Sequence, residues 1–209
     1  RARLKLHGAQ HRAYALSFAA AEIGREIVDQ TNRTVILAGS IGPIGEVMEP
    51  AGTLTHDDAV EIFHEQVEAL MNGGVDIVWL ETISCTREFS AAAEAFARAE
   101  VDWCGTMSFD TRGRTMMGYT PTEMISMIDA ISHKPKAFGA NCGNRLSDLV
   151  RTIKEFKDAK PCLPIIAKGN AGIPKYIDGH IVYNTELDLM GNYAVLSRDC
   201  GARIIGGCC

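Results

Sequence analysis

The sequence alternates short apolar runs with amphipathic stretches, and this alternation restricts the fold more than any other feature. The apolar, strand-like runs begin near residues 35, 75, 101, 137, 163 and 203, and a helical pattern follows each of the first five. No two strands follow one another directly, which predicts a parallel sheet with right-handed crossovers. An open doubly wound sheet and a (β/α)₈ barrel both satisfy the pattern.

Local signals predict the limits of several helices. Apolar spacing predicts a helix from about Ala13 to Gln30, with Leu16, Ala20, Ile23 and Ile27 as its buried stripe. Thr55 with Asp58 predicts a capped helix start, and Gly73-Gly74 predicts its end. Thr120 to Glu123 supplies an N-cap, a first-turn proline and a capping-box glutamate. A longer connection, Gly169 to Asn184, precedes a helix predicted from about Thr185 to Arg198.

The composition indicates a soluble globular protein with a small-molecule substrate. The chain has 209 residues, of which 46% are hydrophobic and 22% charged, with a formal net charge of -5. It has no run of lysine or arginine, so nucleic acid and anionic membranes are not expected partners. It also lacks an apolar stretch of about 18 residues and an N-terminal signal-peptide pattern. We therefore predict a cytoplasmic protein with one domain over residues 1–209.

The seven cysteines are expected to be reduced, because their number is odd and the chain is long for a disulfide scaffold. Parallel α/β folds place their sites at the carboxyl ends of strands, where Cys142, Cys208 and Cys209 fall. Three thiols gathered there predict a soft zinc site. Three unrelated thiols, or a redox-sensitive vicinal pair, are the alternatives. Cys104, Cys162 and Cys200 fall toward the opposite rim and are predicted to be buried small hydrophobes, and Cys85 is not expected to be a ligand.

The vicinal pair Cys208-Cys209 cannot point both side chains inward from a regular strand, because successive side chains alternate between faces. The pair must therefore lie where the strand ends, and Gly206-Gly207 gives the backbone the freedom to turn there. Lys168 also ends a strand and would suit a Schiff-base enzyme, but that reading leaves the cysteines unexplained. Asn141 is predicted to set hydrogen bonding at a strand end rather than to take part in chemistry. No histidine pairs with a cysteine at metal-ligand spacing, and His56 and His64 are predicted to be surface residues.

Taken together, these residues resemble the homocysteine S-methyltransferase family, which includes betaine-homocysteine methyltransferase and the homocysteine domain of cobalamin-dependent methionine synthase. The resemblance extends over nearly the whole chain, in the family's order. It rests on Gly39-Ser40-Ile41-Gly42-Pro43, Leu80-Glu81-Thr82, Asp110 with Gly113-Arg114-Thr115, Asn141-Cys142, Asn170-Ala171-Gly172 and Gly206-Gly207-Cys208-Cys209.

The resemblance implies a (β/α)₈ barrel in which Cys142, Cys208 and Cys209 bind zinc. It also implies that the fourth zinc position accepts the sulfur of homocysteine. Glu81 would hold the amino group of the substrate, and Ser40 or nearby backbone would hold its carboxylate. No catalytic residue beyond the metal site is expected.

The sequence departs from the family pattern at its front. It offers about six of the eight strands of a barrel, and it lacks the first-strand carboxylate that the family uses near the substrate. The resemblance therefore implies an N-terminally truncated fragment, with a homo-oligomer or a complementing N-terminal segment as partner.

The expected reaction follows from thiol chemistry. A thiol with a pKa near 8.5 is only about 3% thiolate at pH 7, whereas a zinc-coordinated thiol is deprotonated. We predict methyl transfer from an activated donor to homocysteine, giving methionine; the sequence does not identify the donor. The alternative is a catalytically silent zinc-binding fragment of the same fold.

Overall fold

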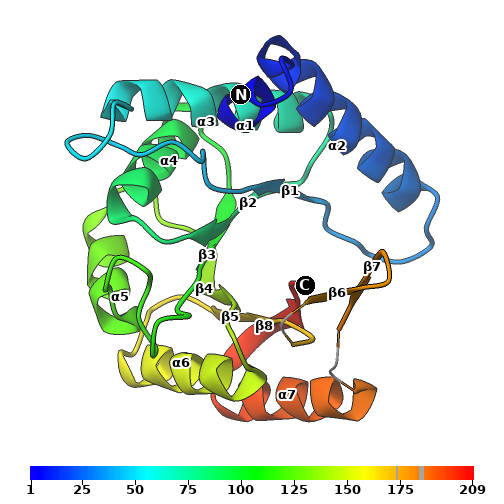
Figure 1. The fold of residues 1–209 in the computed structure, drawn as a ribbon, viewed down its shortest axis with the longest axis vertical. Helices are drawn as coiled ribbons and strands as arrows, with labels where there is room; N and C mark the ends of the chain where they lie inside the picture. Colours follow the sequence, from blue (N-terminus) through cyan, green and yellow to red (C-terminus); the bar gives the residue numbers. More distant parts are fainter. Residues whose placement is uncertain (173, 184–185) are drawn as a thin grey trace. The chain divides into compact units, whose positions relative to one another are not determined.

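The computed structural model describes residues 1–172, 174–183 and 186–209 (Figure 1). Within these residues the parallel strands follow the order β1-β2-β3-β4-β5-β8, and β6 and β7 form a separate two-stranded sheet. The predicted α/β class with parallel strands is therefore confirmed. The chain divides into two compact units, Arg1–Cys104 and Gly105–Cys209, with the boundary inside β3 (Trp103–Met107).

The first unit is a parallel strand pair covered by long helices. β1 and β2 pair in parallel with Ser40 opposite Trp79, and α3 packs against α2, α4 and β1 (Figure 1). The elements of this unit are α1 (Ala2–Lys5), the 3₁₀ helix η1 (Gln10–Arg12), α2 (Ala13–Asp29), β1 (Ala38–Ile41), α3 (His56–Asn72), β2 (Ile77–Ile83) and α4 (Thr86–Arg98).

Helix α3 begins and ends where its sequence predicts. The Thr55 hydroxyl accepts a hydrogen bond from the Asp58 amide at 3.1 Å, which satisfies one of the unpaired amides of the first turn. Gly73 caps the other end, and Gly74 follows with a φ of 97°. Val60, Phe63, Val67 and Leu70 are buried as predicted. Burial of each such side chain contributes about 1.5–3 kcal/mol.

The front of the first unit differs from its prediction in three respects. The chain opens on α1 and η1 rather than on α2. The strand predicted from Val35 begins only at Ala38, and Val35 and Ile36 are exposed. On α2, all four residues of the predicted buried stripe are exposed: Leu16, Ala20, Ile23 and Ile27.

The reason for the exposed stripe is that α2 packs through small residues. Its buried residue is Ala21, and a side chain at Gly73 of the facing helix end would lie only 2.6 Å from the Ala21 Cβ. Leu37 approaches Gly24 of α2 in the same way, within 2.9 Å of an ideal Cβ. Close packing at small residues of α2 and at the end of α3 therefore decided which face of α2 is buried.

The second unit carries three strands in parallel register. Cys142 of β4 lies opposite Gly169 of β5, and Gly169 lies opposite Gly207 of β8. α6 packs against β4 and β5, and α7 against β8. The elements that follow β3 are α5 (Pro121–Ala130), β4 (Ala137–Cys142), α6 (Leu146–Asp158), β5 (Ile165–Gly169), β6 (Lys175–Ile177), β7 (His180–Val182), α7 (Leu187–Asp199) and β8 (Ala202–Gly207).

Aromatic side chains fill the core of each unit. In the first, Trp103 packs between Phe89 and Phe96, with ring centroids 5.7 and 5.1 Å away. In the second, Phe156 of α6 meets Phe109 and Phe138 edge to face at 5.4 and 5.8 Å. Such tilted pairs contribute about 0.5–1.5 kcal/mol beyond their buried area. Each of α4, α5 and α6 has fully buried apolar residues on one face: Phe89 and Phe96, Met124 and Ile128, and Ile153 and Phe156.

The connection between β5 and α7 contains strands that were not predicted from the sequence. It contains the antiparallel hairpin β6–β7, with Tyr176 opposite Ile181. Its turn is Asp178-Gly179, and both residues have positive φ, 49° and 84°. Asp-Gly is a strong signal for a two-residue hairpin turn, so this element was readable from the sequence. α7 begins at Leu187; the predicted start at Thr185 lies outside the described residues.

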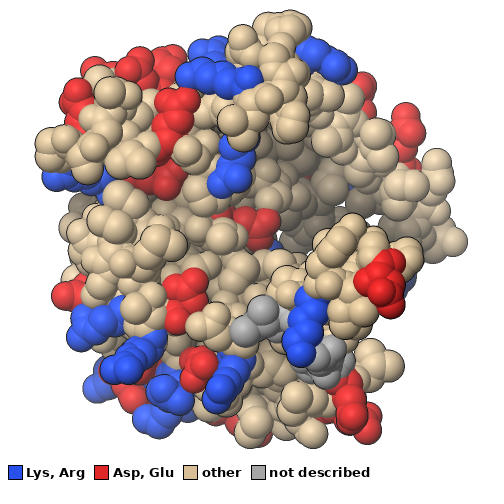
Figure 2. Space-filling model, in the orientation of Figure 1, with Lys and Arg blue, Asp and Glu red and all other residues tan. Residues whose placement is uncertain are grey.

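Charges of both signs are interspersed on the face shown in Figure 2. On α6, Arg151 pairs with Asp148, and Lys154 pairs with Asp158. These two positive charges are therefore matched by acids one turn away. Among the described residues, no helix combines the length and apolar character that crossing a membrane requires.

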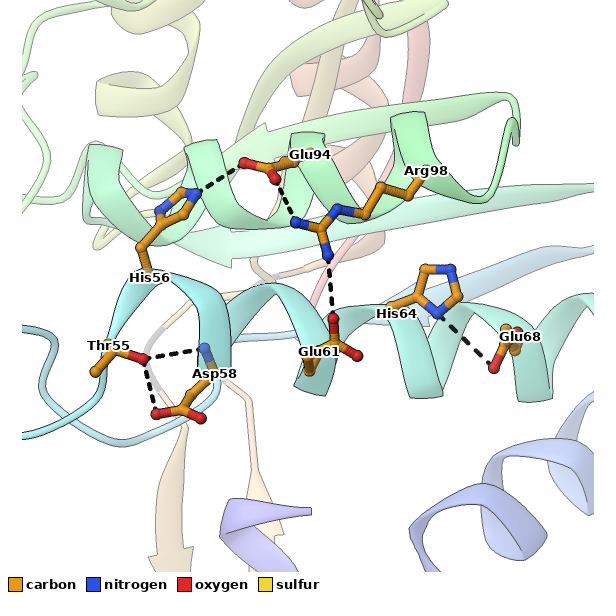
Figure 3. A network of polar contacts seen from close by, with 8 residues as sticks. All are labelled: Thr55, His56, Asp58, Glu61, His64, Glu68, Glu94 and Arg98. Carbon is orange, nitrogen blue, oxygen red and sulfur yellow. Dashed lines mark hydrogen bonds and ion pairs between the residues drawn. The ribbon is translucent and has the colours of Figure 1, made fainter.

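A polar network joins α3 to α4 (Figure 3). One carboxylate oxygen of Glu94 forms a hydrogen bond with His56 Nε2 at 2.9 Å, and the other accepts a hydrogen bond from Arg98 at 2.7 Å. Arg98 also donates to Glu61 of α3 at 3.0 Å. The hydrogen bond from His56, followed by the one from Arg98, lowers the pKa of Glu94.

This network predicts a small, pH-dependent contribution to stability. Because the folded pKa of Glu94 lies below the value of about 4.3 in unfolded chains, its contribution is present above that pH and is lost as the pH falls through the folded pKa. Glu94→Gln should lower the free energy of unfolding at pH 7 by less than about 1 kcal/mol, since the pair is exposed. Urea titrations at several pH values measure this, with Glu22→Gln on the surface of α2 as control. A deficit that stays constant below pH 4 would contradict the assignment.

Candidate metal centre and substrate residues

Cys142 stands at a turn that ends the buried strand β4. Its φ is 61°, in the left-handed region, and Gly143 follows with a φ of 89°. For a residue with a Cβ this conformation costs about 1–2 kcal/mol. The backbone therefore leaves strand geometry at the cysteine itself, and its side chain no longer follows the alternation of the strand.

Cys208 and Cys209 follow the end of β8, as predicted for a vicinal pair. The Cys208 amide donates to the Gly169 carbonyl at 2.9 Å, and the Ala171 amide donates to the Cys209 carbonyl at 2.8 Å. These bonds extend the pairing of β5 and β8 by two residues, so the vicinal pair is held by backbone and not only by its side chains.

The second unit brings the sulfur atoms of Cys142, Cys208 and Cys209 within 4.8 Å of one another. The Sγ atoms of Cys142 and Cys208 are 3.2 Å apart. Tetrahedral zinc with Zn–S bonds of about 2.3 Å sets its sulfur ligands about 3.8 Å apart. The trio therefore fits a zinc ion after small side-chain adjustments. Two of the thiols are half-buried and Cys209 is exposed, which leaves one side open.

The two closest thiols, Cys142 and Cys208, form a hydrogen bond with each other. The hydrogen bond with Cys208 raises the pKa of Cys142, and the hydrogen bond from Cys142 lowers the pKa of Cys208. Cys208 is thus the first thiolate of the cluster, with further help from Asn141 and from the positive charge of Lys168. A lowered thiol pKa favours the thiolate form that binds a cation.

Asn170 joins the two loops that carry the cysteines. Its side-chain nitrogen donates to the Gly143 carbonyl, and its side-chain oxygen accepts from the Cys209 amide, both at 3.2 Å. The sequence singled out Asn170 only as part of a family motif. Its position directly after β5, between the ends of β4 and β8, explains why an amide with one donor end and one acceptor end suits this place.

Asn141 contacts the sulfur atoms directly. Its side-chain nitrogen lies 3.1 Å from Cys142 Sγ and 3.5 Å from Cys208 Sγ. The sequence predicted only strand-end hydrogen bonding for this residue, so these contacts go beyond the prediction. Strand alternation hid them, because neighbouring residues of a regular strand point to opposite faces.

Tyr193 of α7 supports the vicinal pair from the helix layer. Its ring is buried and its hydroxyl donates to the Gly206 carbonyl at 3.5 Å. Burial raises the pKa of Tyr193 to about 12, so the hydroxyl keeps its proton at neutral pH. The residue was not predicted from the sequence.

The proposed substrate residues Ser40 and Glu81 lie together in the first unit. The Ser40 hydroxyl donates to Glu81 Oε1 at 2.5 Å. β2 continues past Glu81 to Ile83, and Thr82 within it has a φ of 64°. The strand thus ends through a local twist that follows the carboxylate. The contact between the two residues is observed, and their roles toward a substrate stay predictions.

Glu88 and Arg3 hold the loop that follows Ser40. The buried Glu88 carboxylate accepts a hydrogen bond from the Ile44 amide at 2.6 Å, and Arg3 donates to the Pro43 carbonyl at 3.1 Å. Burial raises the pKa of Glu88, against the effect of the Ile44 hydrogen bond. Glu88 was not predicted from the sequence. Its signal was a carboxylate three and four residues before Ala91 and Ala92, on the buried face of α4.

The other cysteines only partly follow the prediction of buried hydrophobes. Cys104 is buried in β3, but Cys162 is exposed and Cys200 is half-buried. The two exceptions lie in the loop before β5 and at the end of α7, where the chain turns toward solvent. Cys85 is the N-cap residue of α4.

Residues 1–209 match the protein family described as homocysteine S-methyltransferase. The chain belongs to this family of methyltransferase enzymes. The resemblance stated from the sequence is thereby confirmed.

Solved structures show the same fold. Homocysteine methyltransferase MmuM from Escherichia coli superposes in its oxidized form with a TM-score of 0.76 at 22% identity, over 100% of this chain and 70% of that one. Its metallated form gives 0.73 at 23% identity with the same coverage, and its apo form 0.73 at 20% over 95% and 69%. The predicted fold, part of a (β/α)₈ barrel, is confirmed.

The bridge made by Asn170 predicts a local loss of order when it is removed. Asn170→Ala should leave the Gly143 carbonyl and the Cys209 amide without these partners and lower the free energy of unfolding by about 1–3 kcal/mol. Hydrogen exchange over residues 206–209 should become faster. Asn144→Ala is the control, because Asn144 is exposed and makes one hydrogen bond to the Asp110 carbonyl. Equal exchange in the two variants would show that the bridge is not needed.

Proposed function

We propose that this protein transfers a methyl group from an activated donor to the thiol of homocysteine, giving methionine, with zinc held by Cys142, Cys208 and Cys209. The observation that carries the proposal is the convergence of these three sulfur atoms within 4.8 Å in a member of this family. Three protein ligands with one open position are typical of a catalytic zinc site rather than a structural one. The name of the metallated MmuM structure, which describes that protein, gives further support.

The cysteines prepare the site for its cation and for the substrate. Cys208 is already inclined to the thiolate form, and the exposed side at Cys209 gives access. When bound, zinc lowers the pKa of a coordinated thiol so that the substrate sulfur reacts as a thiolate. The backbone hydrogen bonds of Cys208 to the last residue of β5 and of Cys209 to the segment after it keep the ligands in place.

Glu81 is the proposed partner of the substrate ammonium group. The hydroxyl of Ser40 orients its carboxylate through the 2.5 Å hydrogen bond before substrate binds, and Ser40 is the proposed contact for the substrate carboxylate. The loop after Ser40 is fixed by Glu88. These residues bind and orient; they do not carry protons in the proposed reaction.

The wider setting of the reaction is also a proposal. Free thiolates suit a reducing compartment, which supports the predicted cytoplasmic location. The alternative of a silent zinc-binding fragment, with a homo-oligomer or a complementing segment as partner, stays a prediction. Formation of methionine from homocysteine and a labelled methyl donor separates the two: a metal-loaded chain that forms none with any methylated sulfonium, ammonium, folate or cobalamin donor would contradict the proposed function.

Removal of one ligand should remove the metal. Cys142→Ser replaces a soft thiolate with a hard, weakly acidic oxygen and should abolish most of the affinity for zinc. The measurement is metal content after dialysis, with one equivalent of zinc per chain expected for the unchanged protein. Cys162→Ser, at an exposed cysteine of the same unit, should keep its metal. A full equivalent of zinc in the Cys142 variant would refute the ligand assignment.

Neutralising Glu81 should weaken homocysteine binding and leave the metal in place. Glu81→Gln removes a charged acceptor and should cost about 1.5–3 kcal/mol of binding free energy. Titration calorimetry of zinc-loaded protein measures this. Glu68→Gln on the surface of α3 is the control. If the Glu81 variant binds homocysteine normally, or if it loses zinc, the proposed role is wrong.

A further inference from the structure

Asn141 is placed as a hydrogen-bond donor to the thiol cluster, by a combination of strand and turn. It is the last fully buried residue of β4, with no exposed surface. In a regular strand its side chain and that of Cys142 would point to opposite faces. The left-handed φ of 61° at Cys142 breaks that alternation, and Cys142 Sγ comes to lie 3.1 Å from the Asn141 amide nitrogen. The same nitrogen reaches Cys208 Sγ at 3.5 Å.

The chemistry of the two partners fixes which end of the amide is useful. Thiolates only accept hydrogen bonds, whereas an asparagine amide offers two N–H donors on nitrogen and an acceptor oxygen. Two donors on one nitrogen can serve two sulfur atoms together. The amide oxygen in that position would instead repel them. A buried amide with its nitrogen between two sulfurs is therefore matched to their deprotonated state.

The negative charge of the metal-loaded cluster requires hydrogen-bond donors nearby. Three cysteinates around a divalent cation carry a net charge of -1, and a substrate thiolate makes it -2. Negative charge in a half-buried site is unfavourable unless hydrogen bonds compensate it. Groups that contact metal ligands without binding the metal commonly alter metal affinity by about 10- to 100-fold.

We propose that Asn141 sets the electron density on Cys142 and Cys208 by donating N–H···S hydrogen bonds to both, and so sets how tightly the cluster holds its metal and how much charge remains for the substrate sulfur. Asn141 acts through the ligands and touches no reacting atom, so it is a positioning residue. The inference rests on the proposed function, because it requires that the three cysteines bind a metal.

The test uses cobalt(II) in place of zinc, because a sulfur-to-cobalt charge-transfer band reports directly on the sulfur electrons. Asn141→Leu has a similar volume and no donor. Without hydrogen bonds its thiolates hold their electrons less tightly, so the band should move to lower energy. Asn141→Asp keeps the shape but turns carboxylate oxygens toward the sulfurs, and its affinity for cobalt should fall by about 10- to 100-fold.

Asn144→Leu is the matched control. It removes an amide from the same loop, but that amide donates to the Asp110 carbonyl and not to the sulfur of Cys142 or Cys208. It should leave the band and the affinity unchanged. An unshifted band in folded, cobalt-loaded Asn141→Leu overturns the inference. If circular dichroism shows that the Leu variant does not fold, unchanged affinity and band in Asn141→Asp overturn it instead. Absence of any charge-transfer band in the unchanged protein overturns the proposed metal site itself, which separates the two failures.

Discussion

The candidate site depends on the register of three parallel strands in the second unit. Gly169 of β5 lies opposite Cys142 on one side and Gly207 on the other, so the last residues of β4, β5 and β8 end at one level. The helices leave no room for a side chain at position 169, because a Cβ there would lie 2.7 Å from Leu146 and 2.9 Å from Tyr193. Only glycine therefore fits at this place in the register. A slip of one residue along β4 or β8 would turn the cysteine at its end to the other face.

Around that register, each polar group of the strand ends has a distinct task. Backbone amides of Cys208 and Ala171 continue the pairing beyond β8, the Asn170 side chain ties the loop of Cys142 to Cys209, and the Asn141 side chain faces sulfur. The backbone around the thiols is thus fixed by hydrogen bonds of its own, and the Asn141 side chain adds a direct contact to sulfur. A cluster assembled in this way tolerates the loss of a cation better than one held together by its metal alone.

In the first unit, hydrogen bonds likewise fix the surroundings of a candidate substrate residue, the carboxylate Glu81. Glu81 extends from β2 beside Ser40 of β1, and the next loop is held by the buried Glu88. Burial of a carboxylate is unfavourable unless it is hydrogen-bonded, so a buried Glu88 that accepts from a single loop amide indicates that this loop must keep its shape. Family membership gives the enzyme class, and the match to MmuM gives the fold; the substrate roles of Ser40 and Glu81 are proposals that the family resemblance implies.

The sequence by itself determined the elements whose signals close within a few residues. The cap of α3 at Thr55, the capping box of α5 at Thr120 and Glu123, and the limits of β4 are as predicted, because each depends on hydrogen bonds or periodicity inside one segment. It also selected the three cysteines, since strand polarity and the family motifs both mark them. The tertiary structure decided what depends on a neighbour: α2 buries Ala21 and exposes Ile27 because small residues permit close packing, and Asn141 meets sulfur because the turn at Cys142 breaks strand alternation. At such places the packing partner sets which residues are buried, and φ sets the direction of the side chain. The local sequence specifies neither the packing partner nor φ.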